Sequence, residues 1–421
     1  MKTILQMGQD ARKASKILAT AETERKNAFL LSLADLLESD HTDILAANAE
    51  DVAEAEGVLS PAMVDRLLLN EQRIKGMAKD LRNVAELPDP VGEIFERYTN
   101  PDGLKVRKER IPIGVIAVIY ESRPNVTVDS AGLMIKSGNA AILRGGKETI
   151  RTNQVLISFI QNALSSNGLP ADAIQFIDSP DRSFMLELLQ SDPYVDMVIP
   201  RGGSGLHEFC RKNSRIPVIT GGIGICHLFV DESADLQKSS EVIRNAKVQR
   251  PTVCNALETV LIHRSIAEEF IPKLCAKLAE DGVSFKVDGN AYNILLLNGD
   301  KSIHFEKAGE NDFDTEWLSL VLSVKVVDDV KQAIDHISLH GTGHSDGILS
   351  ENQENIRRFT TEVNSACVYV NASTRFTDGA ELGLGAEIAI STQPLHARGP
   401  MALRELTTYK WVIEGEYQTR K

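Results

Sequence analysis

Short apolar runs alternate with amphipathic segments over most of this chain, and the alternation limits the folds it can adopt. Residues 113–119 are continuously apolar, as expected for a strand that is covered on both faces. A helical pattern follows at residues 126–136, and a second apolar run at residues 140–143. Strands and helices in this order predict an α/β fold with a doubly wound, mostly parallel sheet. Ligands of such sheets bind beyond the carboxyl ends of the strands, so a site is expected in the segments that follow the apolar runs.

The alternation continues to residue 370 and contrasts with the two ends of the chain. Further strands are expected at residues 174–177, 195–199, 216–219, 227–230, 257–262, 321–326, 346–349 and 366–370, and further helices at residues 149–164, 266–280 and 328–339. Residues 1–90 are typical of consecutive helices that form a packing layer. Residues 104–111 and 409–413 have the pattern of half-exposed strands. Exposed strand edges pair readily with another chain, so we expect an oligomer.

The composition is that of an acidic globular protein, with a formal net charge of -13, 43% hydrophobic residues and 25% charged residues. The negative balance argues against binding to nucleic acid or to anionic membranes. No apolar run approaches the roughly 18–20 residues that cross a bilayer, and residues 1–10 lack the apolar core of a signal peptide. We therefore expect a cytoplasmic protein with no nucleic-acid and no membrane partner.

The cysteines and histidines give no metal-binding pattern. The five cysteines are an odd number without a C-x-x-C pair, which favours reduced thiols over disulfides or a zinc site. His336, His340 and His344 are four residues apart, a spacing that can place metal ligands on one helix face. Gly341 and Gly343 interrupt that helix, so we expect solvated or core histidines and no metal.

Cys254 lies in a turn between a helical pattern and a buried apolar run, within residues 248–259. Pro251 discourages continuation of the helix through this turn. A cysteine in such a corner can face a cleft, and the nearby Lys247 and Arg250 would favour its thiolate, the nucleophilic form. A cysteine chosen without other information is more often a small buried apolar residue. The residues of the turn alone leave both interpretations open.

Residues 248–259 resemble the active-site cysteine loop of the gamma-glutamyl phosphate reductase family, within the aldehyde dehydrogenase superfamily. Other parts of the chain also resemble this family. They are E-S-R-P-N at residues 121–125 and the blocks at residues 371–379, 381–387 and 396–401. The resemblance implies NADPH-dependent reduction of L-glutamyl 5-phosphate to L-glutamate 5-semialdehyde and phosphate, a step of proline biosynthesis. The reaction would proceed through a thioester on Cys254.

The resemblance also implies an aldehyde-dehydrogenase-like fold of three parts. The expected parts are an NADP-binding domain with the N-terminal helices (residues 1–97 and 117–230), a catalytic domain (residues 231–385) and a small β oligomerisation arm (residues 98–116 and 400–421). A dimer or tetramer is expected. We expect no fused glutamate kinase in a chain of this length, so the labile acyl phosphate would come from a separate glutamate 5-kinase, with which we expect a transient association.

Asn125 follows the first strong apolar run and is the second catalytic candidate. Its amide is a neutral donor suited to the oxyanion that forms when a thiolate attacks a carbonyl. An asparagine after proline is also common in turns. The resemblance places Asn125 beside the thiol, with the Cys254 backbone N–H as the second oxyanion donor.

Three segments are candidates for cofactor binding. Arg144 and Lys147 follow an apolar run, at the point where the superfamily meets the adenosine ribose, and cations there favour NADP over NAD because they can pair with the 2′-phosphate. Two solvated cations would give the same pattern. A glycine-rich turn at residues 200–205 can bind a pyrophosphate through backbone N–H groups, although it is not G-x-G-x-x-G. Glu316 resembles the glutamate that holds the nicotinamide ribose. The expected cofactor-binding residues are Arg144, Gly145, Lys147, Gly202, Gly203, Ser204 and Glu316.

The substrate and the type of reaction rest on fewer residues. Arg375 can bind a carboxylate or a phosphate, because a guanidinium contacts either group in bidentate fashion, and Ser122 and Asn255 complete the expected substrate-binding set. Thr220 stands near the position where hydrolytic aldehyde dehydrogenases carry the glutamate that activates water, so attack by water should be slow. A hydrolytic aldehyde dehydrogenase and a non-catalytic scaffold of the same fold remain the alternatives.

Overall fold

The computed structural model describes residues 2–420, which divide into two compact units. Of the described residues, the first unit comprises 2–220, 383–389 and 401–420, and the second comprises 221–382 and 390–400. The expected boundary at residue 230 was therefore wrong by one strand. The reason is that β7 (Cys226–Val230) pairs in parallel with β8 (Leu257–His263) and so belongs to the second unit. Two short strands, β14 (Ala389–Ser391) and β15 (Gly399–Met401), lie where the chain passes between the units.

A four-stranded parallel sheet forms the centre of the first unit, in the order β5-β4-β3-β6. Its strands are β3 (Val115–Tyr120), β4 (Ala140–Arg144), β5 (Ile174–Phe176) and β6 (Met197–Arg201). The helices between and after them are α6 (Asn125–Lys136), α7 (Ile150–Ser166), α8 (Arg182–Leu189) and α9 (Ser204–Asn213). Every residue of β3 is buried, which confirms the prediction of a strand covered on both faces.

Residues 216–219 were expected to form another strand, and this prediction was wrong. Val218 forms a single isolated parallel bridge with Val198. Pro217 has no N–H with which to extend a ladder of hydrogen bonds, so the segment does not become a regular strand.

The N-terminal segment is helical, as predicted. Its helices are α1 (Ile4–Leu18), α2 (Thr23–Ser39), α3 (Thr42–Ala55), α4 (Pro61–Leu67) and α5 (Glu71–Glu86). Ser60 caps α4 by accepting a hydrogen bond from the Met63 N–H. The ion pair between Lys26 of α2 and Asp89 is buried, with 2.9 Å between Lys26 Nζ and Asp89 Oδ2.

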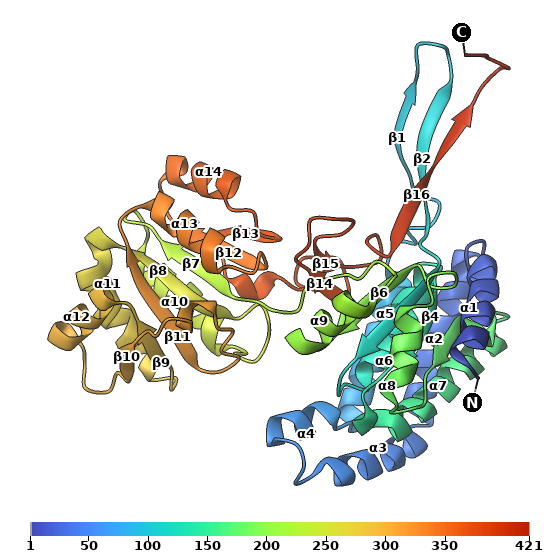
Figure 1. The fold of residues 1–421 in the computed structure, drawn as a ribbon, viewed down its shortest axis with the longest axis horizontal. Coiled ribbons are helices and arrows are strands. Elements are labelled where there is room, and N and C mark those ends of the chain that lie inside the picture. The colour runs from blue at the N-terminus through green and yellow to red at the C-terminus, as the bar shows by residue number, and fades with distance from the viewer. Residues whose placement is uncertain (1, 421) are drawn as a thin grey trace. The chain divides into compact units, whose positions relative to one another are not determined.

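Three antiparallel strands form a separate ribbon that carries the C-terminus (Figure 1). They are β1 (Ile94–Thr99), β2 (Lys105–Pro112) and β16 (Thr407–Glu414), in the order β1-β2-β16. The strands expected at residues 104–111 and 409–413 are confirmed. The start of the arm at residue 98 was wrong, because β1 begins at Ile94 and pairs with β2 along its length.

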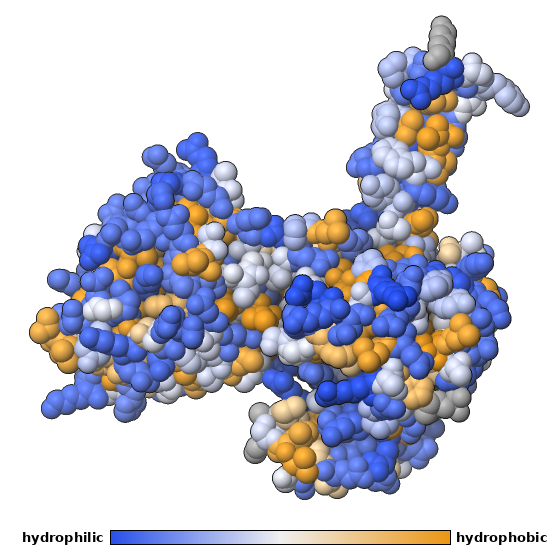
Figure 2. All heavy atoms as spheres, viewed as in Figure 1, coloured by the Kyte–Doolittle hydropathy of each residue, from blue (hydrophilic) through white to orange (hydrophobic). Residues whose placement is uncertain are grey.

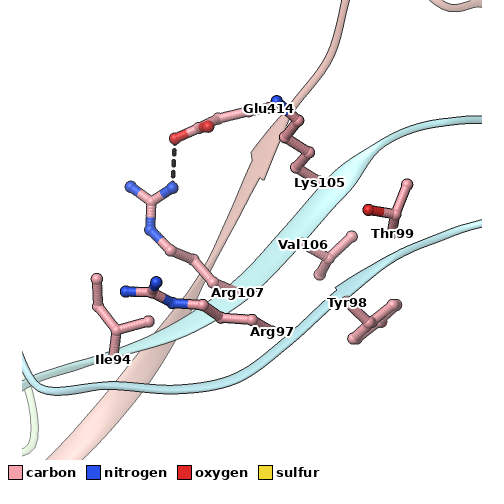
Figure 3. Close-up of a pocket in the computed structure, with 8 residues that line it drawn as sticks. All are labelled: Ile94, Arg97, Tyr98, Thr99, Lys105, Val106, Arg107 and Glu414. Carbon is pink, nitrogen blue, oxygen red and sulfur yellow. Dashed lines mark hydrogen bonds and ion pairs between the residues drawn. The ribbon is translucent and has the colours of Figure 1, made fainter.

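The arm exposes several large aromatic and aliphatic side chains, and Figure 2 shows some orange, hydrophobic residues among the blue ones along the ribbon. Tyr98, Tyr409, Trp411 and Ile413 are each 45–58% exposed. A shallow cavity of about 470 Å³ lies on the arm, lined by basic and apolar side chains and by Glu414. Glu414 accepts a hydrogen bond from Arg107 at the rim of this cavity (Figure 3).

A seven-stranded parallel sheet forms the centre of the second unit, in the order β10-β9-β11-β8-β7-β12-β13. Besides β7 and β8, its strands are β9 (Ser284–Val287), β10 (Phe305–Lys307), β11 (Val321–Val327), β12 (Ser345–Leu349) and β13 (Cys367–Val370). The helices are α10 (Leu236–Val248), α11 (Arg264–Ala279), α12 (Gly289–Asn298), α13 (Val330–His340) and α14 (Gln353–Glu362). Every strand and helix predicted in this part of the sequence is present.

Among residues 2–420, no helix is both long enough and apolar enough to cross a membrane. No cluster of three or more histidine, cysteine or acidic side chains with the arrangement of a metal site occurs in the same range. The histidines near the end of α13 instead pack inside the second unit. His336 and His340 have ring centroids 4.4 Å apart, and His336 and His344 are both buried.

Burial of these histidines predicts a loss of stability in acid. Burial lowers the pKa of His336 to about 2 and the pKa of His344 to about 4, whereas an unfolded histidine titrates near pH 6.5. As the pH falls from about 6.5 towards about 4, the unfolded chain binds protons that the folded chain does not, so the free energy of unfolding decreases. His344 alone accounts for roughly 3 kcal/mol of this decrease.

Urea unfolding at about pH 7.5 and about pH 4.5 tests this linkage. We expect His344→Gln to lose less stability between the two pH values than the wild type does. The matched control is His304→Gln, at an exposed histidine, which should lose as much as the wild type. Equal losses in His344→Gln and the wild type would contradict the prediction.

Candidate active site

Cys254 lies in the loop between α10 and β8, half-buried, as the sequence predicted for a corner between helix and strand. Its backbone is held from β7, because the Cys226 thiol donates to the Cys254 carbonyl oxygen at 3.2 Å. Burial raises the pKa of Cys226 well above its usual range, so this second cysteine stays a neutral donor. Cys254 therefore has the partial access that a nucleophile needs, whereas its neighbour is closed to reagents.

Gly224 fixes the other side of the cysteine loop. A Cβ atom at this position would lie 1.5 Å from the Cys254 carbonyl oxygen, so only glycine allows the two backbones to approach this closely. The Gly224 N–H donates to Glu316 Oε1 at 2.8 Å. The expected nucleophile and the expected nicotinamide-ribose residue are thus both in contact with the same glycine.

Glu316 lies just before β11, and it is partly buried where it meets Gly224. Its burial raises the pKa of the carboxyl group, and the hydrogen bond from Gly224 opposes this shift. A carboxylate so placed can accept hydrogen bonds from ribose hydroxyls with the capacity that the Gly224 N–H leaves unused. Glu316 was predicted from the sequence. It lies near the cysteine loop because Gly224, which donates to it, also packs against Cys254.

Arg375 and Asn255, two of the expected substrate residues, contact each other in the second unit. Arg375 Nη1 donates to Asn255 Oδ1, and Arg375 Nε donates to Gln249 Oε1 at 3.0 Å. The Asn255 amide also donates to the Thr377 carbonyl at 2.9 Å. Asn255 therefore ties the cysteine loop to residues 373–377 and holds Arg375. Burial lowers the pKa of Arg375, and the neighbouring charge of Arg250 lowers it further; two cations this close favour an anionic ligand.

Lys247 does not have the role expected from its position in the sequence. It was expected to favour the Cys254 thiolate, but its Nζ lies 2.7 Å from Glu258 Oε2, and both side chains are fully buried. A lysine paired in this way has its charge compensated by the carboxylate. Arg250 lies within the loop and is exposed.

Asn125 and Ser122 lie in the first unit, in the segment that joins β3 to α6. Asn125 is the first residue of α6, and its Nδ2 donates to Asp129 Oδ2 at 2.9 Å. Burial raises the pKa of Asp129 to about 7. Ser122 is buried and has a φ of 44°, in the left-handed region that non-glycine residues seldom adopt. Strained residues of this kind cluster at functional loops, and here the strained residue adjoins the candidate oxyanion donor.

The expected ribose-phosphate residues follow β4. Arg144 is the last residue of β4, and burial lowers the pKa of its guanidinium, with the charge of Arg182 contributing in the same direction. Gly145 is packed against Asn153 and Tyr120 so closely that a Cβ would lie 2.4 Å from the Asn153 amide nitrogen. Lys147 is exposed at the start of a short 3₁₀ helix, Lys147–Thr149.

The glycine-rich turn after β6 precedes α9, as expected, but one of its donors is already in use. Gly203 is the N-cap of α9 and Ser204 is the first helical residue. The Gly203 N–H donates to Glu121 Oε2 at 3.0 Å, and a Cβ on Gly202 would lie 2.3 Å from the same oxygen. A pyrophosphate at this helix start would therefore use the other N–H groups or displace Glu121.

Comparison with known proteins establishes the family. The Aldehyde dehydrogenase family model matches residues 2–288. Gamma-glutamyl phosphate reductases from Psychromonas ingrahamii and Vibrio vulnificus are similar along the whole chain. The first is 57% identical over 411 residues, which cover 97% of this chain and 98% of the relative, and the second is 53% identical over 418 residues, 99% of each. The chain belongs to the aldehyde dehydrogenase family, among the gamma-glutamyl phosphate reductases. It is an oxidoreductase.

Solved structures of this family agree with that assignment. The gamma-glutamyl phosphate reductase of Thermotoga maritima superposes with a TM-score of 0.96 at 45% identity and covers 100% of both chains. An acetylating aldehyde dehydrogenase from Geobacillus thermoglucosidasius, at 19% identity, covers 99% of this chain and 97% of its own with a TM-score of 0.70 and shares the fold. The predicted fold class and family are confirmed.

Sequence reasoning missed several residues that shape the site. Cys226, Gly224, Glu258 and Asp129 each contact a candidate residue, yet none was singled out. For Gly224 a signal was present, because three glycines within residues 221–224 indicate a close approach of backbone. Cys226 contacts Cys254 from 28 residues away along the chain, and Glu258 contacts Leu318 from 60 residues away, so neither contact leaves a local pattern.

Proposed function

We propose that this oxidoreductase reduces L-glutamyl 5-phosphate to L-glutamate 5-semialdehyde and phosphate, with NADPH as the hydride donor, as a step of proline biosynthesis. The observation that carries the proposal is the half-buried Cys254 in a loop fixed from both sides by Cys226 and Gly224, in a chain that matches gamma-glutamyl phosphate reductases along its full length. Such a loop holds a nucleophile in place without covering it.

In the proposed mechanism the Cys254 thiolate attacks the acyl carbon of the substrate. The Asn125 amide and the Cys254 backbone N–H stabilise the oxyanion, and the C–O bond to phosphate breaks to leave a thioester. When bound, NADPH would supply the hydride that reduces the thioester carbon. The oxyanion of the thiohemiacetal so formed, held again by the Asn125 amide and the Cys254 backbone N–H, would re-form the C=O bond as the C–S bond breaks, which releases the aldehyde and restores the Cys254 thiolate. Because an acyl phosphate is already activated, the protein's main tasks are positioning and charge stabilisation.

The residues of the chain fit an NADP molecule at separate points. The Arg144 guanidinium, with the charge of Arg182 nearby, suits the 2′-phosphate, and Lys147, Gly145 and the N-terminus of α9 (Gly202, Gly203 and Ser204) lie in the same unit. The Glu316 carboxylate suits the nicotinamide ribose. For the substrate, Arg375 is the proposed anion-binding residue and Asn255 its support, with Ser122 adjoining Asn125.

We further propose that the arm of β1, β2 and β16 pairs with a second copy of the chain. Its exposed aromatic and aliphatic side chains support this, because ribbons with such edges seldom stay unpaired. In this proposal the first unit binds the cofactor and the second carries the nucleophile. Transient association with glutamate 5-kinase fits the lability of an acyl phosphate; static light scattering of the mixed pair that shows only separate proteins would contradict it.

A hydrolytic aldehyde dehydrogenase is the competing activity. It needs a carboxylate that activates water against the thioester. Thr220 stands near the position at which the resemblance to the superfamily predicts that carboxylate. The Glu316 carboxylate is hydrogen-bonded to the same glycine-rich segment, where it accepts the Gly224 N–H.

The reverse reaction separates the two activities. The assay supplies glutamate 5-semialdehyde with NADP or NAD and follows reduced nicotinamide, with and without inorganic phosphate. We expect sustained turnover to require phosphate and to be faster with NADP. Turnover of equal rate without phosphate, with glutamate as product, would replace the proposal with the hydrolytic one.

A further inference from the structure

Lys247 and Glu258 form an ion pair that the proposed mechanism does not use. Lys247 is the penultimate residue of α10 and Glu258 is the second residue of β8, so the pair spans the two ends of the cysteine loop. The distance between Lys247 Nζ and Glu258 Oε2 is 2.7 Å, and both side chains are 0% exposed. The pair joins the last turn of α10 to the first residues of β8. It therefore fixes the distance between the two ends of the loop at residues 249–256.

Stability alone is a weak reason for such a pair. Burying two charged groups costs about as much free energy as their attraction returns, and apolar side chains of similar volume often serve equally well. Burial raises the pKa of Glu258 to about 7 and lowers that of Lys247, so each group depends on its partner to remain charged. A buried pair whose two charges depend on each other fixes one arrangement of the segments that it joins.

The second oxygen of Glu258 reaches a different part of the site. Glu258 Oε1 accepts a hydrogen bond from the Leu318 N–H at 3.3 Å. Leu318 has a φ of 49°, in the left-handed region that a leucine seldom adopts. Glu316 lies two residues before it, so the bond from Glu258 helps to hold the turn that presents the Glu316 carboxylate to Gly224. A leucine keeps such a conformation only where its surroundings impose it.

We propose that the Lys247–Glu258 pair is a positioning device that holds the Cys254 loop and the Glu316 turn at fixed positions relative to each other. One oxygen of Glu258 fixes the ends of the nucleophile loop through Lys247, and the other fixes the turn of the nicotinamide-ribose residue through Leu318. The inference rests on the proposed function, because it takes Cys254 and Glu316 as the nucleophile and a cofactor residue. Neither Lys247 nor Glu258 contacts the reacting atoms in this account.

Two double variants separate the two halves of the device. Lys247→Met/Glu258→Leu removes the ion pair and also the acceptor for the Leu318 N–H. Lys247→Met/Glu258→Gln removes the ion pair and keeps an amide oxygen for that N–H. Two readouts need no catalytic turnover: the affinity for NADPH, from quenching of its fluorescence, and the rate at which iodoacetamide alkylates Cys254, from peptide mass spectrometry.

We expect the leucine variant to bind NADPH about tenfold more weakly than the glutamine variant, because it lacks the hydrogen bond from the Leu318 N–H that holds the Glu316 turn, and one such hydrogen bond contributes about that much to an equilibrium. Both variants should alkylate Cys254 several-fold faster than the wild type, because the loop is no longer fixed at its ends. Glu258→Asp keeps the charge opposite Lys247 but is too short to reach Leu318. It should fold and weaken NADPH binding without changing the alkylation rate, so the test stands even if the leucine variant does not fold.

The matched control is the other buried lysine–carboxylate pair described above, Lys26 with Asp89 in the first unit. Lys26→Met/Asp89→Leu changes the melting temperature but should change neither readout. Folded Lys247 and Glu258 variants with wild-type NADPH affinity and alkylation rate would overturn the inference. Failure of the wild type to bind NADPH would instead refute the cofactor assignment, and the alkylation rates would still decide whether the pair positions Cys254.

Discussion

Replacing Cys254 by alanine should lower kcat for the proposed reduction by at least about 10⁴-fold, because no other group in this loop can form the thioester. The fold should be retained, since Cys254 is half-buried and it contacts Cys226 and Gly224 through its own backbone carbonyl. Affinity for NADPH should change little, because the lost sulfur is not expected to bind the cofactor. The measurement is steady-state reduction of freshly prepared L-glutamyl 5-phosphate, with the melting temperature as a check on folding.

The control for this substitution is Cys275→Ala. Cys275 is fully buried in α11, and burial raises the pKa of its thiol out of the reactive range. The Cys275 variant should keep its activity, with at most a modest loss of stability. A Cys254→Ala protein with wild-type activity would refute the mechanism and favour the alternative of a scaffold or a different nucleophile.

Replacing Asn125 by alanine should lower kcat by about 10²- to 10³-fold, the usual loss when one oxyanion donor is removed. The KM for NADPH should stay near its wild-type value, because the amide is assigned to the transition state of acyl transfer and not to the cofactor. Removal of the amide also releases Asp129, its hydrogen-bond partner at 2.9 Å. Measuring kcat and KM separately for both substrates distinguishes a catalytic loss from a general weakening of binding.

A second asparagine near a helix start provides the comparison for Asn125→Ala. Asn290 is exposed in the first turn of α12, so Asn290→Ala should leave both kinetic constants unchanged. An Asn125 variant that raises KM without lowering kcat would contradict the oxyanion role and indicate ground-state binding.

Much of the fold could be predicted because buried parallel strands leave a strong local pattern. The continuous apolar runs that became β3, β4, β8 and β11 are examples. The errors occurred where local pattern and tertiary pairing diverge. Residues 216–219 are apolar enough for a strand, but Pro217 has no N–H to donate to a neighbouring strand, and the segment forms a single bridge. The strands β9 and β10 were not predicted, since runs of three or four residues carry too little periodicity. The helix between them, α12, was also missed.

The candidate site also contains residues that could be predicted from the sequence and residues that could not. Cys254, Asn125 and Glu316 could be named because they stand in segments that resemble a family. What surrounds them could not be predicted, because the partners come from far along the chain: Cys226 reaches the Cys254 carbonyl from β7, and Glu258 reaches Leu318 from β8. Lys247 shows the risk of judging a charge from sequence distance, since its ammonium pairs with Glu258 and not with the thiol.

In the proposed reaction an acyl group is held on Cys254 until phosphate removes it. The most direct test mixes the enzyme with NADP and glutamate 5-semialdehyde in the absence of phosphate, follows NADPH through the first turnover and then locates any adduct by peptide mass spectrometry. We expect a burst of about one NADPH per chain, an acyl group on the Cys254 peptide, and rapid turnover once phosphate is added. Sustained NADPH formation without phosphate, or an adduct on any other residue, would contradict it.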